Sequence, residues 1–213
     1  MPSENSWKAE TIALGQRIAH RRNLMYTYDG PPPAAPSLPS GFEIVRATTE
    51  ILEASMQDPE LASRKRRYIR FVNAGLVGYL ALHEGQWAAA GWIALPEIPR
   101  YPGQIPDNFN AKYYWLFEAH TYAPFRGLGL HKALVIARLR YLADMNEGIA
   151  QAVADVNPNN TPSRRSYERL GFKESGIMDI WTLSLPRVRR EPFGIWRKKA
   201  AHPPILVEGS EHR

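Results

Sequence analysis

Cysteine is absent from all 213 residues of the sequence. This absence excludes a disulfide framework, a thiolate metal site and a thiol nucleophile. Apolar runs are short, and none approaches the roughly 20 residues that a helix needs to span a bilayer. The first six residues, Met-Pro-Ser-Glu-Asn-Ser, lack the basic start and apolar core of a secretory signal. We therefore expect a cytoplasmic protein without a membrane span.

The overall composition is that of a globular protein, with 44% hydrophobic and 23% charged residues. The length suits one domain of about 150 residues with extensions. The net charge is +6, and basic residues concentrate in two stretches, 64–70 and 187–199. Solvated surfaces explain such stretches, as do a phosphorylated cofactor, an acidic substrate or a nucleic acid. Charge alone does not choose among these.

The clearest boundary is the segment 30–41, which carries five prolines. Proline is incompatible with a helix interior or a central strand, so this segment is a linker or an arm. Before it, residues 7–21 have helical spacing and residues 23–29 are consistent with a short strand. We predict an N-terminal helix and proline-rich arm over 1–40, a main domain over 41–186 and a basic tail over 187–213.

Within the main domain, helical and strand patterns alternate. The order predicts an α/β fold with a mixed sheet of about six to seven strands flanked by helices. A turn at Glu84-Gly85-Gln86 predicts a hairpin. The predicted strands are 42–46, 76–83, 87–95, 113–122, 151–156, 172–176 and 178–185. The predicted helices are 50–57, 59–73, 130–145 and 161–170, and 98–111 is predicted to be a loop.

A glycine loop joins the strand 113–122 to the helix that begins at residue 130. Gly127 and Gly129 permit positive φ, so backbone N–H groups can point into one concavity. The concavity opens on a helix N-terminus, which attracts phosphate, and Arg126 adds a cation. Ordinary turn chemistry explains many such loops. The dinucleotide fingerprint is excluded because Lys132 replaces its third glycine, and a Walker loop is absent.

Two motifs, about 30 residues apart, carry a resemblance to a known family. The first is Arg126-x-x-Gly129-x-His131, close to the Arg/Gln-x-x-Gly-x-Gly/Ala signature of acetyl-CoA binding. The second is Asn160-x-x-Ser163-x-x-x-Tyr167-Glu-x-x-Gly171-Phe172. In this order, and joined by a helix and a strand, both resemble the motifs of the GNAT superfamily of N-acetyltransferases. The resemblance covers roughly 41–185.

The resemblance implies a GNAT fold whose sheet is splayed at the cofactor site. It implies acetyl-CoA, or another acyl-CoA, as co-substrate, with no metal. A primary amine then attacks the thioester directly, and the implied acceptor is a small molecule such as an amino sugar, an amino acid or a biosynthetic amine. The cofactor-binding residues that it implies are Thr121, Tyr122, Arg126, Gly127, Leu128, Gly129, Leu130, His131, Asn160, Ser163 and Tyr167.

The resemblance indicates one candidate for the catalytic acid, whereas the general base has several candidates. Tyr167 matches the family's acid, which protonates the departing thiolate, although a purely structural role is open. Glu118 and His120 are the candidate bases on the strand 113–122, with a base elsewhere or bulk water as the alternative. Strand alternation places Glu118 on the opposite face of the strand from Trp115 and Phe117. Family bases often lie on the face that Trp115 and Phe117 occupy. A β-bulge would reverse that.

Other functions remain open. His131 replaces the small residue that lets the loop approach the pyrophosphate, so it either donates to a phosphate or loosens binding. The basic excess fits an acetyltransferase that modifies a protein or an aminoacyl-tRNA, with nucleic acid as a partner. A CoA-binding interaction module without turnover is a third hypothesis, and a homodimer is open.

Overall fold

The computed structural model describes residues 18–96, 98, 105–106, 109, 112–183 and 192–199. Its strands are β1 (Ile18–Gly30), β2 (Phe42–Arg46), β3 (Val77–His83), β4 (Gln86–Ala94), β5 (Trp115–Thr121), β6 (Ala150–Val156), β7 (Lys173–Leu183) and β8 (Pro192–Lys198). Its α-helices are α2 (Thr49–Ser55), α3 (Ala62–Asn73), α5 (Leu130–Asp144) and α6 (Thr161–Arg169), with short 3₁₀ turns at Pro59–Leu61 and Ala123–Phe125.

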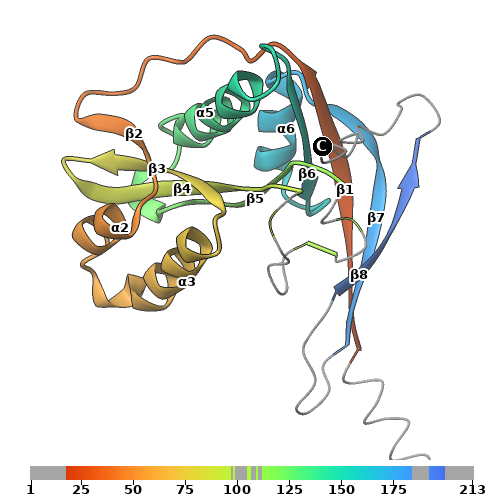
Figure 1. The fold of residues 1–213 in the computed structure, drawn as a ribbon, viewed down its shortest axis with the longest axis horizontal. Helices are drawn as coiled ribbons and strands as arrows, with labels where there is room; N and C mark the ends of the chain where they lie inside the picture. The colour runs from red at the N-terminus through yellow and green to blue at the C-terminus, as the bar shows by residue number, and fades with distance from the viewer. Residues whose placement is uncertain are drawn as a thin grey trace, which may run out of the picture.

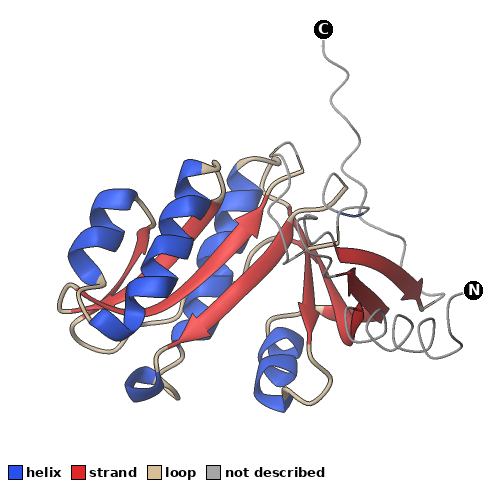
Figure 2. Cartoon of the chain, turned by 90° about the horizontal axis from the view of Figure 1, so that it is seen from below, coloured by secondary structure: helices blue, strands red, loops and turns tan. Residues whose placement is uncertain are grey.

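The eight described strands form one sheet in the order β2-β3-β4-β5-β6-β1-β7-β8 (Figure 2, strands in red). Among these strands, only the β5–β6 pair is parallel. The helices α2 and α3 lie on one face of the sheet, and α5 and α6 lie on the other (Figure 1). This arrangement confirms the predicted α/β fold with a mixed sheet. Within the described part, no helix is long and apolar enough to cross a membrane.

The N-terminal prediction is partly wrong. Residues 18–21, predicted as the end of a helix, belong to β1, whose residues 23–29 are confirmed as strand. Strand β1 lies between β6 and β7 and pairs with both, for example at Leu24↔Val156 and Leu24↔Ile177. These long-range ladders override the local helical spacing. Residues 7–17 of the predicted helix lie outside the described residues.

The predicted basic tail also contributes a strand. Residues 192–198 form β8, which pairs antiparallel with β7 at the end of the sheet. Burial alternates along it, and Trp196 packs against Tyr113 with ring centroids 5.4 Å apart. The sheet therefore takes one strand from each segment that flanks 41–186. The remainder of the tail, except Lys199, lies outside the described residues.

Residues 173–183 form one strand, β7, where two were predicted. The predicted break falls at Gly176, which has φ 138° and sits beside a register shift in the β1 ladder. A Cβ at Gly176 would collide with the carbonyl oxygen of Arg197 in β8. Glycine here permits close approach of the neighbouring strand, so the ladder continues through the boundary that the sequence predicts between two strands.

Helix α5 is confirmed, and its packing places the site. Its fully buried side chains include Val135, Arg138 and Leu139, whereas Met145, the last residue of the predicted helix 130–145, is 49% exposed. The proline-rich segment runs from β1 to β2 past α5 (Figure 1). Its Leu38 packs against the cluster that contains Leu130 and Leu134 of the helix. Covered on both sides, α5 buries a wider face than a single stripe.

Candidate active site

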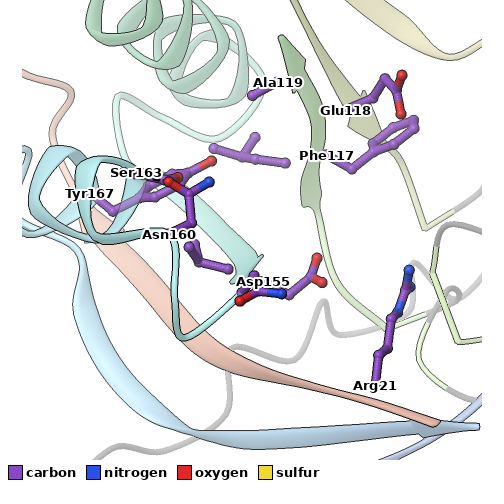
Figure 3. Close-up of a pocket in the computed structure, with 11 residues that line it drawn as sticks. Arg21, Phe117, Glu118, Ala119, Asp155, Asn160, Ser163 and Tyr167 are labelled. Atoms are coloured by element: carbon purple, nitrogen blue, oxygen red, sulfur yellow. Dashed lines mark hydrogen bonds between the residues drawn. The ribbon is translucent and has the colours of Figure 1, made fainter.

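The strands β5 and β6 separate after a short parallel contact. They pair only at Trp115↔Val153 and Leu116↔Ala154, whereas β5 stays paired with β4 as far as Thr121. A cavity of about 230 Å³ lies where they part, and we call it the strand cavity. It is lined by Arg21, Leu116, Phe117, Glu118, Ala119, Asp155, Val156, Asn157, Asn160, Ser163 and Tyr167 (Figure 3). The separation frees backbone amides of β5 from the β6 ladder.

A β-bulge in β5 orients Glu118. The β4–β5 register passes from Trp92↔Phe117 to Ala90↔His120, so Glu118 and Ala119 together lie opposite one residue of β4. Glu118 has the left-handed φ of 48°, which a glutamate adopts only when its surroundings impose it. Phe117 and Glu118 consequently point to one side of β5 and Ala119 to the other (Figure 3). The bulge removes the objection from strand alternation.

The Glu118 carboxylate lies toward α3 and is mostly buried. Its Oε1 accepts a hydrogen bond from Arg67 Nη1 at 2.8 Å, and 13% of its side chain is exposed. The ion pair with Arg67 therefore fixes the carboxylate on the side of β5 that faces α3. Such a group can attract an ammonium and accept its proton.

His120, the alternative base, lies against an indole. Its ring stacks on that of Trp87 with centroids 5.8 Å apart and an angle of 5° between planes. Burial, with the positive charges of Arg64 and Arg126, lowers the pKa of His120 to about 4. His120 is therefore neutral at pH 7 and, with so low a pKa, holds a transferred proton weakly.

Tyr167 lies in α6 at the strand cavity and is only 3% exposed. Burial raises the pKa of its phenol above 10, the positive charge of Arg138 opposes that rise, and the negative charge of Asp155 adds to it. The phenol therefore keeps its proton at neutral pH, as a proton donor must.

Residues at the start of α6 both cap the helix and line the strand cavity. Asn160 is the N-cap, and its side-chain oxygen accepts a hydrogen bond from Ser163 N at 3.2 Å. Asn160 therefore caps α6. Both residues also line the strand cavity, so capping and cofactor contact are compatible.

A second cavity of about 860 Å³ lies between the glycine loop and α6, and we call it the loop cavity. Gly127 and Gly129 have φ values of 82° and 76°, as predicted for this loop. Gly129 is the N-cap of α5 and has no side chain to bind the first helix amides, which remain available to an anion. The lining is Thr121, Phe125, Arg126, Gly127, Gly129, Leu130, His131, Lys132, Thr161, Pro162, Arg165, Ser166 and Arg169.

The charges of the loop cavity fit the phosphates of CoA. Four of its lining residues are cations and none is a carboxylate. Three of these cations, Lys132, Arg165 and Arg169, are absent from the cofactor residues predicted from the sequence. The spacing of Thr161, Arg165 and Arg169 at i, i+4 and i+8 was an available signal, because it places them on one helix face.

Two of the predicted cofactor residues line neither cavity. Tyr122 lies on the other side of β5, with its ring 5.9 Å from that of Trp87. The side chain of Leu128 is exposed at the loop tip.

His131 joins α5 to α6. Its Nδ1 lies 2.9 Å from Ser166 Oγ, and its ring packs edge-on against Tyr167 at 5.5 Å. Burial, and then the charge of Arg138, lower the pKa of His131 to about 4. The imidazole is neutral at pH 7, so any contact with a phosphate is a hydrogen bond without charge.

The fold and the two cavities define an α/β protein with a candidate acyl-CoA site where β5 and β6 separate. The model of the acetyltransferase (GNAT) family matches residues 44–172, and the chain belongs to this family. Among curated proteins, none matches the sequence.

Solved structures share the fold at low identity. A GCN5-related N-acetyltransferase-like protein from Streptococcus suis is 16% identical, with a TM-score of 0.50 over 84% of this chain and 68% of that one. A tandem GNAT protein from the clavulanic acid biosynthesis pathway is 15% identical, with a TM-score of 0.53 over 88% and 62%. A Drosophila protein is 17% identical, with a TM-score of 0.52 over 86% and 58%. The chain thus spans about three fifths of the length of the last two.

Gly129→Val should abolish stabilisation by CoA. A β-branched residue does not tolerate φ 76°, so the loop must change its shape and withdraw its amides. Ligand binding to the native state raises the melting temperature, which thermal unfolding with and without CoA measures. Gly148→Val is the matched control, because Gly148 has φ 87° beyond the opposite end of α5. An unchanged CoA shift in Gly129→Val would remove the loop from the cofactor site.

Proposed function

We propose that the protein transfers an acetyl group from acetyl-CoA to the primary amine of a small molecule. The observation that carries this proposal is that α6 borders both cavities. Asn160, Ser163 and Tyr167 line the strand cavity, while Thr161, Pro162 and Ser166 line the loop cavity. A ligand with phosphates at one end and a thioester at the other fits this arrangement along one helix.

In this proposal, acetyl-CoA supplies the activated thioester and the chain supplies binding and proton transfer. The loop amides and the cations Arg126 and Arg165 hold the phosphates. Backbone amides of β5 beside the bulge polarise the acetyl carbonyl. Glu118 accepts a proton from the acceptor ammonium, directly or through water, and Tyr167 gives its proton to the sulfur. The amine nitrogen forms the new C–N bond as the C–S bond breaks.

The size and charge of the strand cavity support a small acceptor. At about 230 Å³ it is smaller than typical drug-sized pockets. Glu118 is one of its lining residues, and a carboxylate suits a cationic amine. We infer that the acceptor is a compact amine that reaches the thioester from the side of Glu118.

Turnover of acetyl-CoA across a broad library of amines tests the proposal. Because the chain has no cysteine, every free thiol that appears is CoA. We expect thiol release that depends on both enzyme and amine for at least one compound class. Thermal stabilisation by CoA without thiol release from any amine would contradict the proposal and favour a CoA-binding interaction module.

Helix α3 supports a second candidate, acetylation of an anionic macromolecule such as an aminoacyl-tRNA. Ser63, Arg66, Arg67, Ile69 and Arg70 surround a hollow of about 530 Å³, and Arg67 is the partner of Glu118. Cations beside the proposed base suit a phosphate backbone. This candidate requires that the protein acetylates aminoacyl-tRNA. It also requires that the affinity for tRNA falls steeply as the salt concentration rises, because phosphate contacts release counterions.

A further inference from the structure

A buried cation lies behind the proposed acid. Arg138, in the middle of α5, has no exposed surface. Its Nε donates to Leu134 O and its Nη1 to Trp92 O, both at 3.1 Å. Its Nη2 has no hydrogen-bond partner of normal geometry in the described part of the chain, although the guanidinium interacts with the Tyr167 phenol, and no carboxylate there forms an ion pair with it. A buried charge without a counter-charge destabilises a fold, so the presence of Arg138 at this position calls for another reason.

The strand beside Arg138 is built to admit it. A Cβ on Gly91 of β4 would lie 2.8 Å from Arg138 Cζ, so only glycine leaves room for the guanidinium. Gly91 is also the residue opposite the Glu118–Ala119 bulge. The cation therefore packs against β4 at the level where β5 bulges and separates from β6.

Two titratable groups interact with Arg138 directly, and a third acts on one of them. Tyr167 from α6 and His131 from α5 interact electrostatically with Arg138, whose charge opposes the rise in the pKa of Tyr167 and contributes to the low pKa of His131. Asp155 from β6 acts on Tyr167 in the opposite direction, and it is bound by Trp115 Nε1 at 2.9 Å. Of these groups, Tyr167 and Asp155 line the strand cavity.

We propose that Arg138 is a positioning residue that acts through Tyr167. The guanidinium holds the phenol at the strand cavity and stabilises the phenolate left after proton transfer. In that step the C–S electron pair stays on sulfur, the proton moves from the Tyr167 oxygen to sulfur, and the negative charge comes to rest beside Arg138. This inference rests on the proposed acetyl transfer and adds a residue to it.

A double-mutant cycle tests the coupling. Arg138→Gln keeps a donor but removes the charge, and turnover should fall about tenfold or more, the effect of moving a nearby charge away from a titrating group. In a Tyr167→Phe background the same change should cost less than about twofold, because the phenol through which it acts is gone. Arg138→Lys should retain more turnover than Arg138→Gln. Equal fold losses in both backgrounds would overturn the proposal.

The thiol of bound CoA gives a readout that needs no acceptor. Thiolate absorbance can be titrated in the complex, with the desulfo-CoA complex subtracted to remove tyrosine, and the chain contributes no thiol of its own. In Arg138→Gln the bound thiol should ionise at a higher pH than in wild type, where the proton concentration is roughly tenfold lower, because a positive charge that favours the thiolate has been removed. Unchanged ionisation would overturn the inference. The expected change in a protein that acetylates no amine would instead reject the proposed function and leave the role of Arg138 standing.

Gly91→Ala supplies a second variant that leaves the charge in place. Its Cβ must displace the guanidinium, so turnover should fall as in Arg138→Gln. Added to Arg138→Gln, it should cause little further loss. Thermal stabilisation by CoA in each variant shows that the site is folded. Full turnover in Gly91→Ala would contradict a role for the position of Arg138.

Discussion

Glu118→Gln should slow acetyl transfer by roughly 10²–10⁴-fold near neutral pH, the usual contribution of a positioned general base. Most of an amine with a pKa near 10 is protonated at pH 7 and needs a base before it can attack. As pH rises the free amine becomes abundant, so the variant should recover toward the wild-type rate. The measurement is turnover against pH at saturating acetyl-CoA.

A suitable control is Glu84→Gln. Glu84 has φ 49°, close to the 48° of Glu118, but it lies in the β3–β4 turn and lines neither cavity. Its profile should match that of wild type. A Glu118→Gln profile with the wild-type shape and a lower melting temperature would make Glu118 structural. Weaker acceptor affinity wherever the amine is charged would make it a binding group.

Tyr167→Phe should lower turnover by roughly 10–10³-fold and change CoA affinity only a few-fold. The pKa of Tyr167 is raised above 10 by burial, so the wild-type phenol keeps its proton through neutral pH and can give it to the thiolate. Phenylalanine fills the same space without the proton. Steady-state turnover and the CoA-induced melting shift, measured on the same samples, separate catalysis from binding.

Tyr26→Phe is the matched control for this prediction. Tyr26 is also fully buried and stacks on Tyr167 at 6.0 Å, but its hydroxyl donates to Glu168 and it lines neither cavity. Its turnover should stay near that of wild type. A wild-type rate in Tyr167→Phe would show that the thiolate leaves without an acid, and it would remove the group through which Arg138 is proposed to act.

Elements with local signals were predicted well. The glycine loop, the start of α5 and the capped helix α6 depend on residues within a few positions of one another. Gly127 and Gly129 do adopt positive φ, and Asn160 does cap α6. Such features form from short-range sterics and hydrogen bonds, so the residue types at given spacings suffice to identify them.

Strands β1 and β8 show where such signals fail. Residues 18–21 have helical spacing, yet they pair with β7 more than 150 positions away, as in Arg21↔Ile180. The basic residues around β8 concealed a strand whose Trp196 packs against Tyr113. A strand forms only when its partner is present, and the choice of partner depends on the whole sheet.

The sequence alone determined the family, and it identified the glycine loop as the candidate cofactor loop and Tyr167 as the candidate acid, because each belongs to a short motif. Only the tertiary structure decided the direction and the ion-pair partner of the Glu118 side chain. A bulge opposite Gly91 sets the direction, and the partner is Arg67, 51 positions away in the sequence. The tertiary structure also brought Arg138 to Tyr167. Bulges and long-range charge contacts depend on register and packing between elements distant in the chain, which no spacing within one element can encode.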